Sequence, residues 1–288
     1  MFKLWFGPRG YERWVALPAQ GVQRGLLGWS SRSEYVGGGV SVSASDGDHM
    51  EYSFSWNALS SADTRHIRDI LNGAYATDGN RGLIYFIDPA ANTLNLFSEM
   101  WARPSLCASF GAPSLIKGKR PTLVATGANA FGLPPRSAQF TIADGDPANT
   151  FYVPIPPGYA AHFGFYGPTE QADKIIARPY TGETAGAPVA HDIQANADYG
   201  TGLSTVSSAS GATGVEFYLS PTAGTATITA AVLQVIPVAD TPVSPVSWIS
   251  GQGHSGCQRD GSADQTLITS AFDQQSLGVN LVERGSWL

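Results

Sequence analysis

Apolar and polar side chains alternate through most of residues 39–57. The run from Val40 to Ala44 alternates with serine, and after Asp46-Gly47 the same period of two resumes from Met50 to Trp56. Two such runs on either side of an Asp-Gly dipeptide are typical of a β-hairpin. The pattern therefore predicts a hairpin that turns at Asp46-Gly47 and packs its aromatic face on another sheet or on a helix.

The segment after this predicted hairpin carries the signals of a short helix. Ser60 can serve as the N-cap, Asp63 follows as its capping-box partner, and Gly73 can end the helix. Apolar residues recur between these ends at helical spacing, at Ile67, Ile70, Leu71 and Ala74. We expect a helix over residues 61–72, and no other segment predicts one as strongly.

Two further patterns predict strands. The run from Leu83 to Ile87 is apolar throughout and stops at Asp88-Pro89, which indicates a strand buried on both faces. Between residues 122 and 237, short alternating runs are separated by Pro, Gly and Asp-Gly turns. These runs lie around residues 138–143, 149–155, 159–166, 174–180, 187–193, 214–219 and 225–236. Many short strands at this spacing are typical of a β-sandwich of the jelly-roll type.

The tryptophans divide the chain into ends and middle. All seven lie before residue 118 or after residue 240: Trp5, Trp14, Trp29, Trp56, Trp101, Trp248 and Trp287. Cys107 and Cys257 follow the same division, and the sequence leaves open whether their thiols are close. A chain of 288 residues suits two domains. We predict one domain built from residues 1–117 and completed by 243–288, with a second domain, residues 118–242, inserted between them.

Composition and charge narrow the class of protein. Charged residues make up only 14% of the chain, while 33 glycines and 19 prolines favour a turn-rich, mainly β protein. The net charge of −6 and the lack of a long basic run argue against nucleic-acid binding, and Lys117–Arg120 suits a solvated linker. No apolar run is long enough for a signal peptide or a membrane span. We expect a soluble chain that is first present in a cytoplasm.

The sequence holds no strong catalytic or metal-binding motif. Gly253-His254-Ser255-Gly256-Cys257 approaches the Gly-x-Ser-x-Gly pattern but ends in cysteine and lies in a glycine-rich turn. Asp46/Asp48 and Asp144/Asp146 each flank a glycine, as turn residues commonly do. The histidines lack metal-ligand spacing: His49, His66, His162, His191 and His254. We predict no catalytic residue, no cofactor and no metal, and hence no enzyme.

Two alternatives involve the middle domain. Its tyrosines and phenylalanines could stack on sugars, with Tyr159, Phe163, Tyr166 and Tyr180 as glycan-contact candidates, or they could fill the sandwich core. A β-sandwich hydrolase is the weaker alternative, because it needs two carboxylates about 5–10 Å apart across a cleft. The candidates for such a pair are Glu183, Asp192 and Glu216.

Several segments at the two ends form a recognisable succession. They are the run of Met50, Tyr52, Phe54 and Trp56, the helix 61–72, Gly82–Pro89, Trp101–Pro104, Trp248–Cys257, Ser270–Asp273 and Leu281–Trp287. Together they resemble the minor tail proteins of long-tailed phages (siphoviruses) that infect actinobacteria, and most of all their distal tail protein. The resemblance covers residues 1–110 and 246–288, and the middle has only a general likeness to carbohydrate-binding modules.

This resemblance implies a structural protein of the virion, made in the cytoplasm of the bacterial host. Such proteins form a ring, usually a hexamer, that extends the tail tube at the baseplate. The expected partners are other copies of the chain, the tail tube and tape-measure proteins, and the tail-associated and receptor-binding proteins. The ring domain is expected to be a β-sandwich with a helix and a hairpin. The second domain, galectin-like, is here inserted rather than appended, and host glycan is a further expected ligand in the alternative of a glycan-binding accessory protein.

The residues themselves point the same way. A chain with low charge, no catalytic cluster and many tryptophans in one domain suits burial against copies of itself, and head-to-tail contacts can close into a ring. Aromatic residues are also enriched at the centres of interfaces. We take Trp5, Trp14, Tyr75 and Trp101 as candidates for contacts between subunits. The alternative is that they fill the core of the sandwich.

Overall fold

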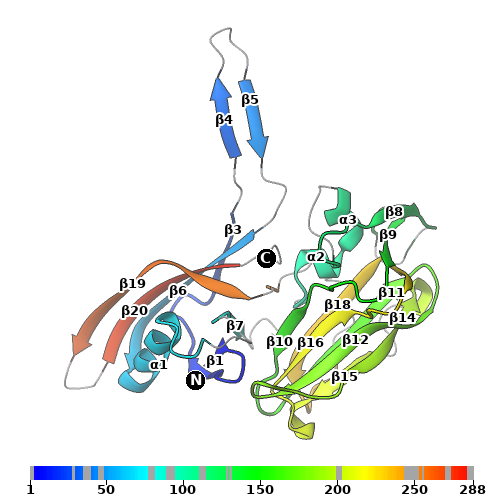
Figure 1. Ribbon diagram of the computed structural model, residues 1–288. Coiled ribbons are helices and arrows are strands. Elements are labelled where there is room, and N and C mark those ends of the chain that lie inside the picture. The colour runs from blue at the N-terminus through cyan, green and yellow to red at the C-terminus, as the bar shows by residue number, and fades with distance from the viewer. Residues whose placement is uncertain are drawn as a thin grey trace.

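A computed structural model describes most of the chain. The described residues are 3–27, 30–34, 40–44, 49–76, 82–88, 95–109, 115–127, 129, 132–198, 203–242, 253–254, 256–269 and 274–283. Trp29, Trp248, Trp287 and the Asp46-Gly47 dipeptide lie outside them. The fold is mainly β, as predicted, and its strands form two units that lie against each other (Figure 1).

The first unit is a seven-stranded sheet that draws on both ends of the chain. Its strands, in spatial order, are β2 (Arg13–Ala16), β1 (Lys3–Pro8), β7 (Ile84–Ile87), β19 (Cys257–Thr269), β20 (Gln274–Glu283), β6 (His49–Ser60) and β3 (Gln23–Leu27). Strands β19 and β20 come after the second unit in sequence, yet they lie between β7 and β6 in space (Figure 1). The buried strand predicted at residues 83–87 is confirmed as β7, since all four of its residues are buried.

This sheet curls until its two ends pack face to face. Strands β7 and β19 meet at one residue pair within the described residues, so the sheet is nearly divided at that point. The Phe6 ring of β1 lies 5.7 Å from the Phe54 ring of β6, although four strand positions separate β1 from β6. Trp56 Nε1 of β6 donates a hydrogen bond to the carbonyl oxygen of Ala16 in β2, at 2.7 Å. The first unit is therefore sandwich-like, with its aromatic side chains between the layers.

Helix α1 (Ser61–Leu71) packs on this core, and the helix predicted over residues 61–72 is confirmed. Ser60 is the N-cap, and its hydroxyl accepts a hydrogen bond from the amide of Asp63 at 3.1 Å. Gly73, just after the helix, has φ +74°, a left-handed conformation that glycine adopts readily. Ile67 and Ile70 are buried among the aromatic residues of β1 and β6.

The hairpin predicted at Asp46-Gly47 is wrong in its pairing. Strand β5 (Val40–Ala44) pairs with β4 (Ser30–Glu34), whereas β6 pairs with β3 and β20. The run of residues 40–44 thus pairs with residues 30–34, and the run of residues 50–56 lies in β6, so the two runs belong to two strand pairs of one ribbon, the outer pair β4-β5 and the inner pair β3-β6. Alternation with a period of two predicts extended strands, but it does not show which strands pair with each other.

The outer part of this ribbon, β4 and β5, stands clear of both units (Figure 1). Its strands pair with each other from Ser30↔Ala44 to Glu34↔Val40, and with no other strand in the described part of the chain. Nearer the body, β3 and β6 are in register up to the pair Leu27↔His49. We call the two outer strands, β4 and β5, the arm.

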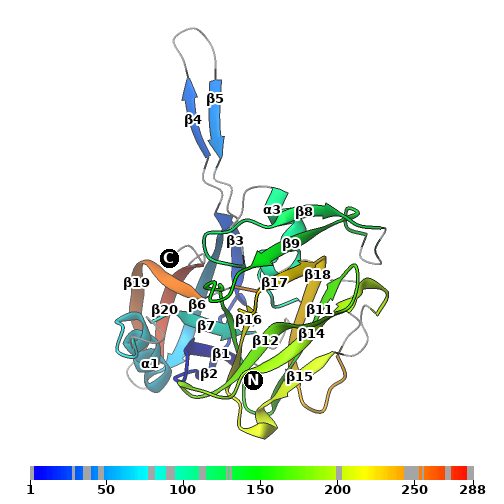
Figure 2. The same cartoon turned by 45° about the vertical axis from the view of Figure 1, so that its right-hand side comes forward.

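The second unit contains an eight-stranded and a three-stranded sheet (Figure 2). The larger sheet has β10 (Phe151–Pro154), β16 (Gly214–Leu219), β12 (Gln171–Thr181), β14 (Val189–Ala195), β11 (Tyr159–Gly167) and β15 (Ser204–Ser207), with β13 (Thr184–Ala185) on β12 and β18 (Ala230–Pro237) on β11. The smaller has β17 (Gly224–Ile228), β9 (Arg136–Ile142) and β8 (Thr122–Ala125). The 3₁₀ helices η2 (Asn196–Asp198) and η3 (Ser208–Ser210) flank β15.

Most strands predicted for this unit are found, and one is divided. The run predicted at 225–236 forms β17 and then β18, which belong to different sheets on either side of Thr229. The hydroxyl groups of Thr229 and Ser137 lie 2.7 Å apart and are hydrogen-bonded where the chain changes sheet. The alternation of apolar and polar residues continues across Thr229, so the sequence pattern does not reveal that the chain passes from one sheet to the other.

Residues 95–109 and 115–116 pack with the second unit, whereas the predicted boundary lies at residue 117. The Asn95 side chain donates to the carbonyl oxygen of Ala231 at 2.8 Å and accepts from the amide of Leu233 at 3.0 Å, so it pairs with β18 as a strand would. Phe97 and Trp101 are buried in the same core as the sandwich strands. Short helices α2 (Glu99–Ala102) and α3 (Pro104–Ser109) lie in this segment, and both are too short to produce a helical period.

The first unit needs the C-terminal strands for its core. Leu281 of β20 is fully buried, so Leu281→Ala removes packed apolar atoms and should lower the free energy of unfolding by about 2–5 kcal/mol. Urea denaturation followed by circular dichroism measures the loss. Val282→Ala, at the neighbouring half-buried position, is the matched control and should cost much less. Equal losses for the two variants would show that β20 does not complete this core.

Candidate functional site

The two units meet at the turn between β1 and β2. This turn, residues 9–12, faces β10, β12 and β16 of the second unit, and β7 lies beside β10 (Figure 1). Gly10 has φ +83°, and a Cβ atom there would stand 2.9 Å from the amide nitrogen of Glu183. A larger residue would push the units apart, so glycine is required for this close approach. We call the contact between the two units the junction.

Arg9 is the central side chain of the junction. Its guanidinium carbon lies 4.5 Å from the ring centroid of Tyr152 and 4.4 Å from that of Tyr180. Its Nη2 atom lies 3.4 Å from Oε1 of Glu216, and the two side chains are only 14% and 9% exposed. A desolvated cation over an aromatic ring gains roughly 2 kcal/mol, and a buried ion pair depends strongly on both partners. Arg9 therefore joins the first unit to β10, β12 and β16 at one point.

A second carboxylate, Glu12, lies in the same place. Its Oε1 accepts a hydrogen bond from the hydroxyl of Tyr152 at 2.9 Å, and its Oε2 accepts from the amide of Gly10 at 2.8 Å. Burial raises the pKa of the Glu12 carboxyl to about 7, although these hydrogen bonds and the charge of Arg9 act to lower it. The Glu12 side chain therefore changes charge near neutral pH.

Three tyrosines surround these charged groups. Tyr85 of β7 packs edge-on against Tyr152 with ring centroids 4.8 Å apart, and Tyr152 packs similarly against Tyr180. The hydroxyl of Tyr180 donates to Oε2 of Glu216 at 3.1 Å. Burial raises the pKa of all three hydroxyls, that of Tyr85 to about 12, so these tyrosines stay neutral at physiological pH.

The segment that returns from the second unit is wedged beside the junction. A Cβ atom on Gly253 would lie 1.5 Å from the carbonyl oxygen of Leu96, so only glycine fits. His254 follows, with its ring centroid 4.3 Å from that of Phe86, and burial lowers the pKa of its imidazole to about 3. His254 is thus a neutral core residue rather than a general base. Cys257 is buried and free, while Ser255 and the side chain of Cys107 lie outside the described residues.

The subunit-contact candidates lie in three different places. Trp5 is 7% exposed and packs edge-on against Trp14, which in turn contacts Tyr159 of the second unit. These two tryptophans thus contribute to the junction within one chain. Trp101 is 1% exposed and lies in the core, as the alternative held. Tyr75 is half-buried and stacks on exposed Tyr11, so this pair still offers surface to a neighbour.

The glycan-contact candidates do not form a sugar platform. Phe163, Tyr166 and Tyr180 are buried, with 6% exposure at most, and Tyr159 is half-covered beside Trp14. Stacking on a sugar requires an open ring face. For the three buried rings the core interpretation holds, because Phe163 lies in the main core, Tyr166 lies in a smaller cluster with Ala230 and Val232, and the junction covers Tyr180.

The carboxylates proposed for a hydrolase take part in structural contacts. Glu216 pairs with Arg9, and Glu183 accepts a hydrogen bond from the hydroxyl of Tyr11 at 3.3 Å. Asp192, on β14, accepts from the amide of Asp173 at 2.9 Å. Within the described residues, no three His, Cys, Asp or Glu side chains come together as a metal site would require.

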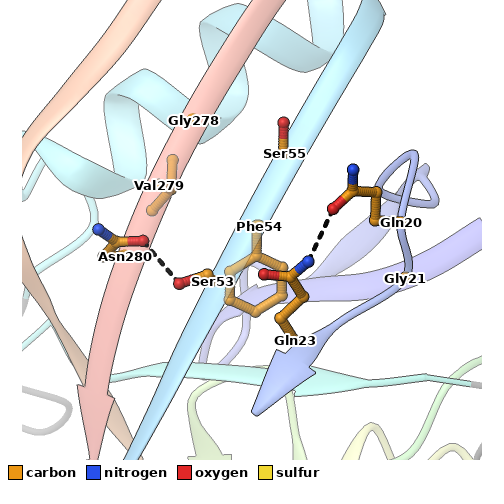
Figure 3. A pocket seen from close by; sticks show the side chains of 9 residues that line it. All are labelled: Gln20, Gly21, Gln23, Ser53, Phe54, Ser55, Gly278, Val279 and Asn280. Atoms are coloured by element: carbon orange, nitrogen blue, oxygen red, sulfur yellow. Dashed lines mark hydrogen bonds between the residues drawn. The ribbon is translucent and has the colours of Figure 1, made fainter. Parts of the chain in front are cut away.

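A hollow of about 220 Å³ lies on the outer face of the first unit (Figure 3). It is lined by Gln20, Gly21, Gln23, Ser53, Phe54, Ser55, Gly278, Val279 and Asn280. The side chains of Gln23 and Gln20 are hydrogen-bonded to each other at 2.7 Å, and those of Ser53 and Asn280 at 2.9 Å. The lining has no charged group, and much of its hydrogen-bonding capacity is used internally, so the hollow is a weak candidate for a binding site.

Sequence reasoning missed the junction. Its polar members come from the turn between β1 and β2 and from β7, β10, β12 and β16, and Arg9 and Glu216 are 207 positions apart. Pro8 and Gly10 indicate a tight turn at this point, but nothing local to the turn shows that it meets a second unit.

Comparisons with models of protein families, with curated proteins and with solved structures find no match to this chain. In the parts of the chain that the structure describes, no helix combines the length and the apolar character needed to cross a membrane. Among the described residues, the junction is the site with the most specific geometry, and its contacts join one unit to the other.

Removing the Arg9 guanidinium should destabilise the junction strongly. Arg9→Ala leaves Glu216 buried without its cation, and we expect a loss of about 3–5 kcal/mol in the free energy of unfolding. Urea denaturation followed by tryptophan fluorescence measures it. Arg65→Ala, on the exposed face of α1, is the matched control and should stay within about 0.5 kcal/mol of the wild type. If Arg9→Ala unfolds like the control, the ion pair does not hold the units together.

Proposed function

We propose that this chain is a structural protein of a phage tail tip. In this proposal copies of the chain assemble into a ring that extends the tail tube and anchors the tail-tip and receptor-binding proteins. The arm is the observation that carries the self-assembly. The tail location rests on the resemblance of residues 1–110 and 246–288 to distal tail proteins.

The arm supports assembly because it is unstable in isolation. A two-stranded ribbon in water is marginally stable at best, and each of its strands has one edge of unpaired backbone groups. Val40, Val42 and Ala44 alternate with serine in the sequence of β5. A ribbon of this kind becomes more stable when it packs against another surface. Within one molecule it stands away from both units (Figure 1).

The first unit has further surface suited to contacts between copies. Strands β2 and β3 are the end strands of the sheet, and each pairs on one side only within the described residues. The outer face of β6 and β20 carries Ser53, Ser55 and Asn280, small polar groups without charge (Figure 3). A contact from the arm of one copy to the body of the next is head-to-tail, and such contacts close into rings when the rotation allows.

The second unit suits a platform held outside such a ring. It is inserted between two segments of the first unit, and the junction fixes its orientation through Arg9, Tyr152 and Glu216. A firmly held sandwich can present partner proteins at a constant position. The alternative of glycan binding through this unit loses support, because three of its four candidate rings are buried.

Removal of the arm tests the proposal directly. Leu27 and His49 form the last pair of β3 and β6, so residues 28–48 can be replaced by Asn-Gly, which closes a two-residue hairpin. We expect the wild-type chain to form one closed oligomer by light scattering and electron microscopy. The shortened chain should be monomeric and keep the circular dichroism of its two units.

The control changes exposed apolar residues elsewhere. Val189 and Val238 are about half exposed on the second unit, and Val189→Ser with Val238→Ser should leave the oligomer intact. A wild-type chain that stays monomeric at high concentration would contradict self-assembly, and so would an oligomer that survives loss of the arm. Localisation of the chain outside the tail tip in virions would contradict the rest of the proposal.

A further inference from the structure

We propose that the junction is a proton-dependent latch, which holds the two units together most tightly when Glu12 is protonated and loosens as pH rises through neutrality. The latch consists of Arg9, Glu12, Tyr152, Tyr180 and Glu216. It does not depend on ring assembly, because every member belongs to one chain.

The charged groups at the junction are out of balance when Glu12 is ionised. Two carboxylates, Glu12 and Glu216, meet one guanidinium at the junction, and Glu216 already pairs with Arg9. An ionised Glu12 therefore adds a negative charge without a cation of its own. Its two hydrogen bonds, from Tyr152 and Gly10, come from neutral dipoles. Glu12 is half-buried, and withdrawing even part of such a charge from water is costly unless it is paired.

A neutral Glu12 side chain fits the same geometry. A protonated carboxyl has one oxygen that still accepts from the Gly10 amide and one hydroxyl that can donate. The hydroxyl of Tyr152 can turn from donor to acceptor, since it has both capacities. Protonation thus keeps both contacts at 2.8 and 2.9 Å and removes the surplus charge.

The other titratable and charged groups around Glu12 come from each element packed at the junction. They are Arg9 in its own turn, Tyr85 of β7, Tyr152 of β10, Tyr180 and Arg178 of β12, Glu183 after β12, and Glu216 of β16. Burial raises the pKa of the three tyrosines, and arginine stays charged, so neither the tyrosines nor the arginines titrate near neutrality. Arg178 donates to the hydroxyl of Tyr218 at 2.8 Å rather than to Glu12.

The direction of the pH effect follows from linkage. Burial raises the pKa of Glu12 to about 7 in the closed junction, from an ordinary value of 4.5 when the turn is exposed to water. The closed state therefore binds the proton more tightly than the open state. Its stability is greatest below pH 4.5 and falls as pH rises toward 7. From these two pKa values, opening becomes about 30-fold more favourable between pH 5.5 and pH 8.5.

The test uses the full chain with Glu12→Gln, and Glu170→Gln at an exposed position of the second unit as the matched control. Hydrogen exchange of the backbone amides in residues 8–16 and 151–154, corrected for the intrinsic effect of pH, reports opening of the junction. We expect the wild type and the Glu170→Gln variant to open about 30-fold more at pH 8.5 than at pH 5.5. The Glu12→Gln variant should show little change.

A second variant keeps the proposal testable if Glu12→Gln does not fold. Tyr152→Phe preserves the ring over Arg9 but removes a hydrogen bond that is stronger to the ionised carboxylate than to the neutral carboxyl, so the loosening should move to higher pH. Carbon-13 chemical shifts of the Glu12 carboxyl give its titration midpoint directly. A wild-type midpoint near 4.5, equal pH dependence in Glu12→Gln, or an unchanged midpoint in Tyr152→Phe would each overturn the latch.

Discussion

The pairing of β20 with β6 is the interaction on which the rest of the molecule depends. It extends from Gln274↔Ser60 to Val282↔Glu51, and it brings the C-terminal part of the chain back to the N-terminal part across the whole second unit. Without β19 and β20, the sheet would separate into β2-β1-β7 and β6-β3. The aromatic side chains of β6 would then be more exposed to water. The sheet would no longer be continuous between β1, which carries Phe6, and β6, which carries Phe54.

The same pairing explains why the junction can be so specific. The chain leaves the first unit after β7, whose Tyr85 packs on Tyr152 at the junction, and it re-enters with Gly253, which packs against Leu96. A tether at both ends limits rotation of one unit on the other, and one guanidinium between two rings then fixes the remaining freedom. Firm attachment and sensitivity to one proton thus arise from one small set of side chains.

Much of the local structure was predictable because its causes are local. Ser60, Asp63 and Gly73 define α1 within a few residues, and the all-apolar run of β7 indicates burial on both faces. Pairing was less predictable, since β5 alternates equally well whether it turns back or continues into β6. The junction was not predictable at all. The contact between Arg9 and Glu216 depends on how the two folded units dock. Docking of this kind produces no periodic pattern in the sequence.

The position of β19 and β20 has a consequence for biosynthesis. The insert is translated completely before β19, so on the ribosome it can fold while the first unit still lacks two inner strands. Until those strands emerge, β6 presents Tyr52, Phe54 and Trp56 beside an unpaired backbone edge. Such a surface is prone to stick to other nascent chains, so the cell must shield it for as long as translation of the insert lasts.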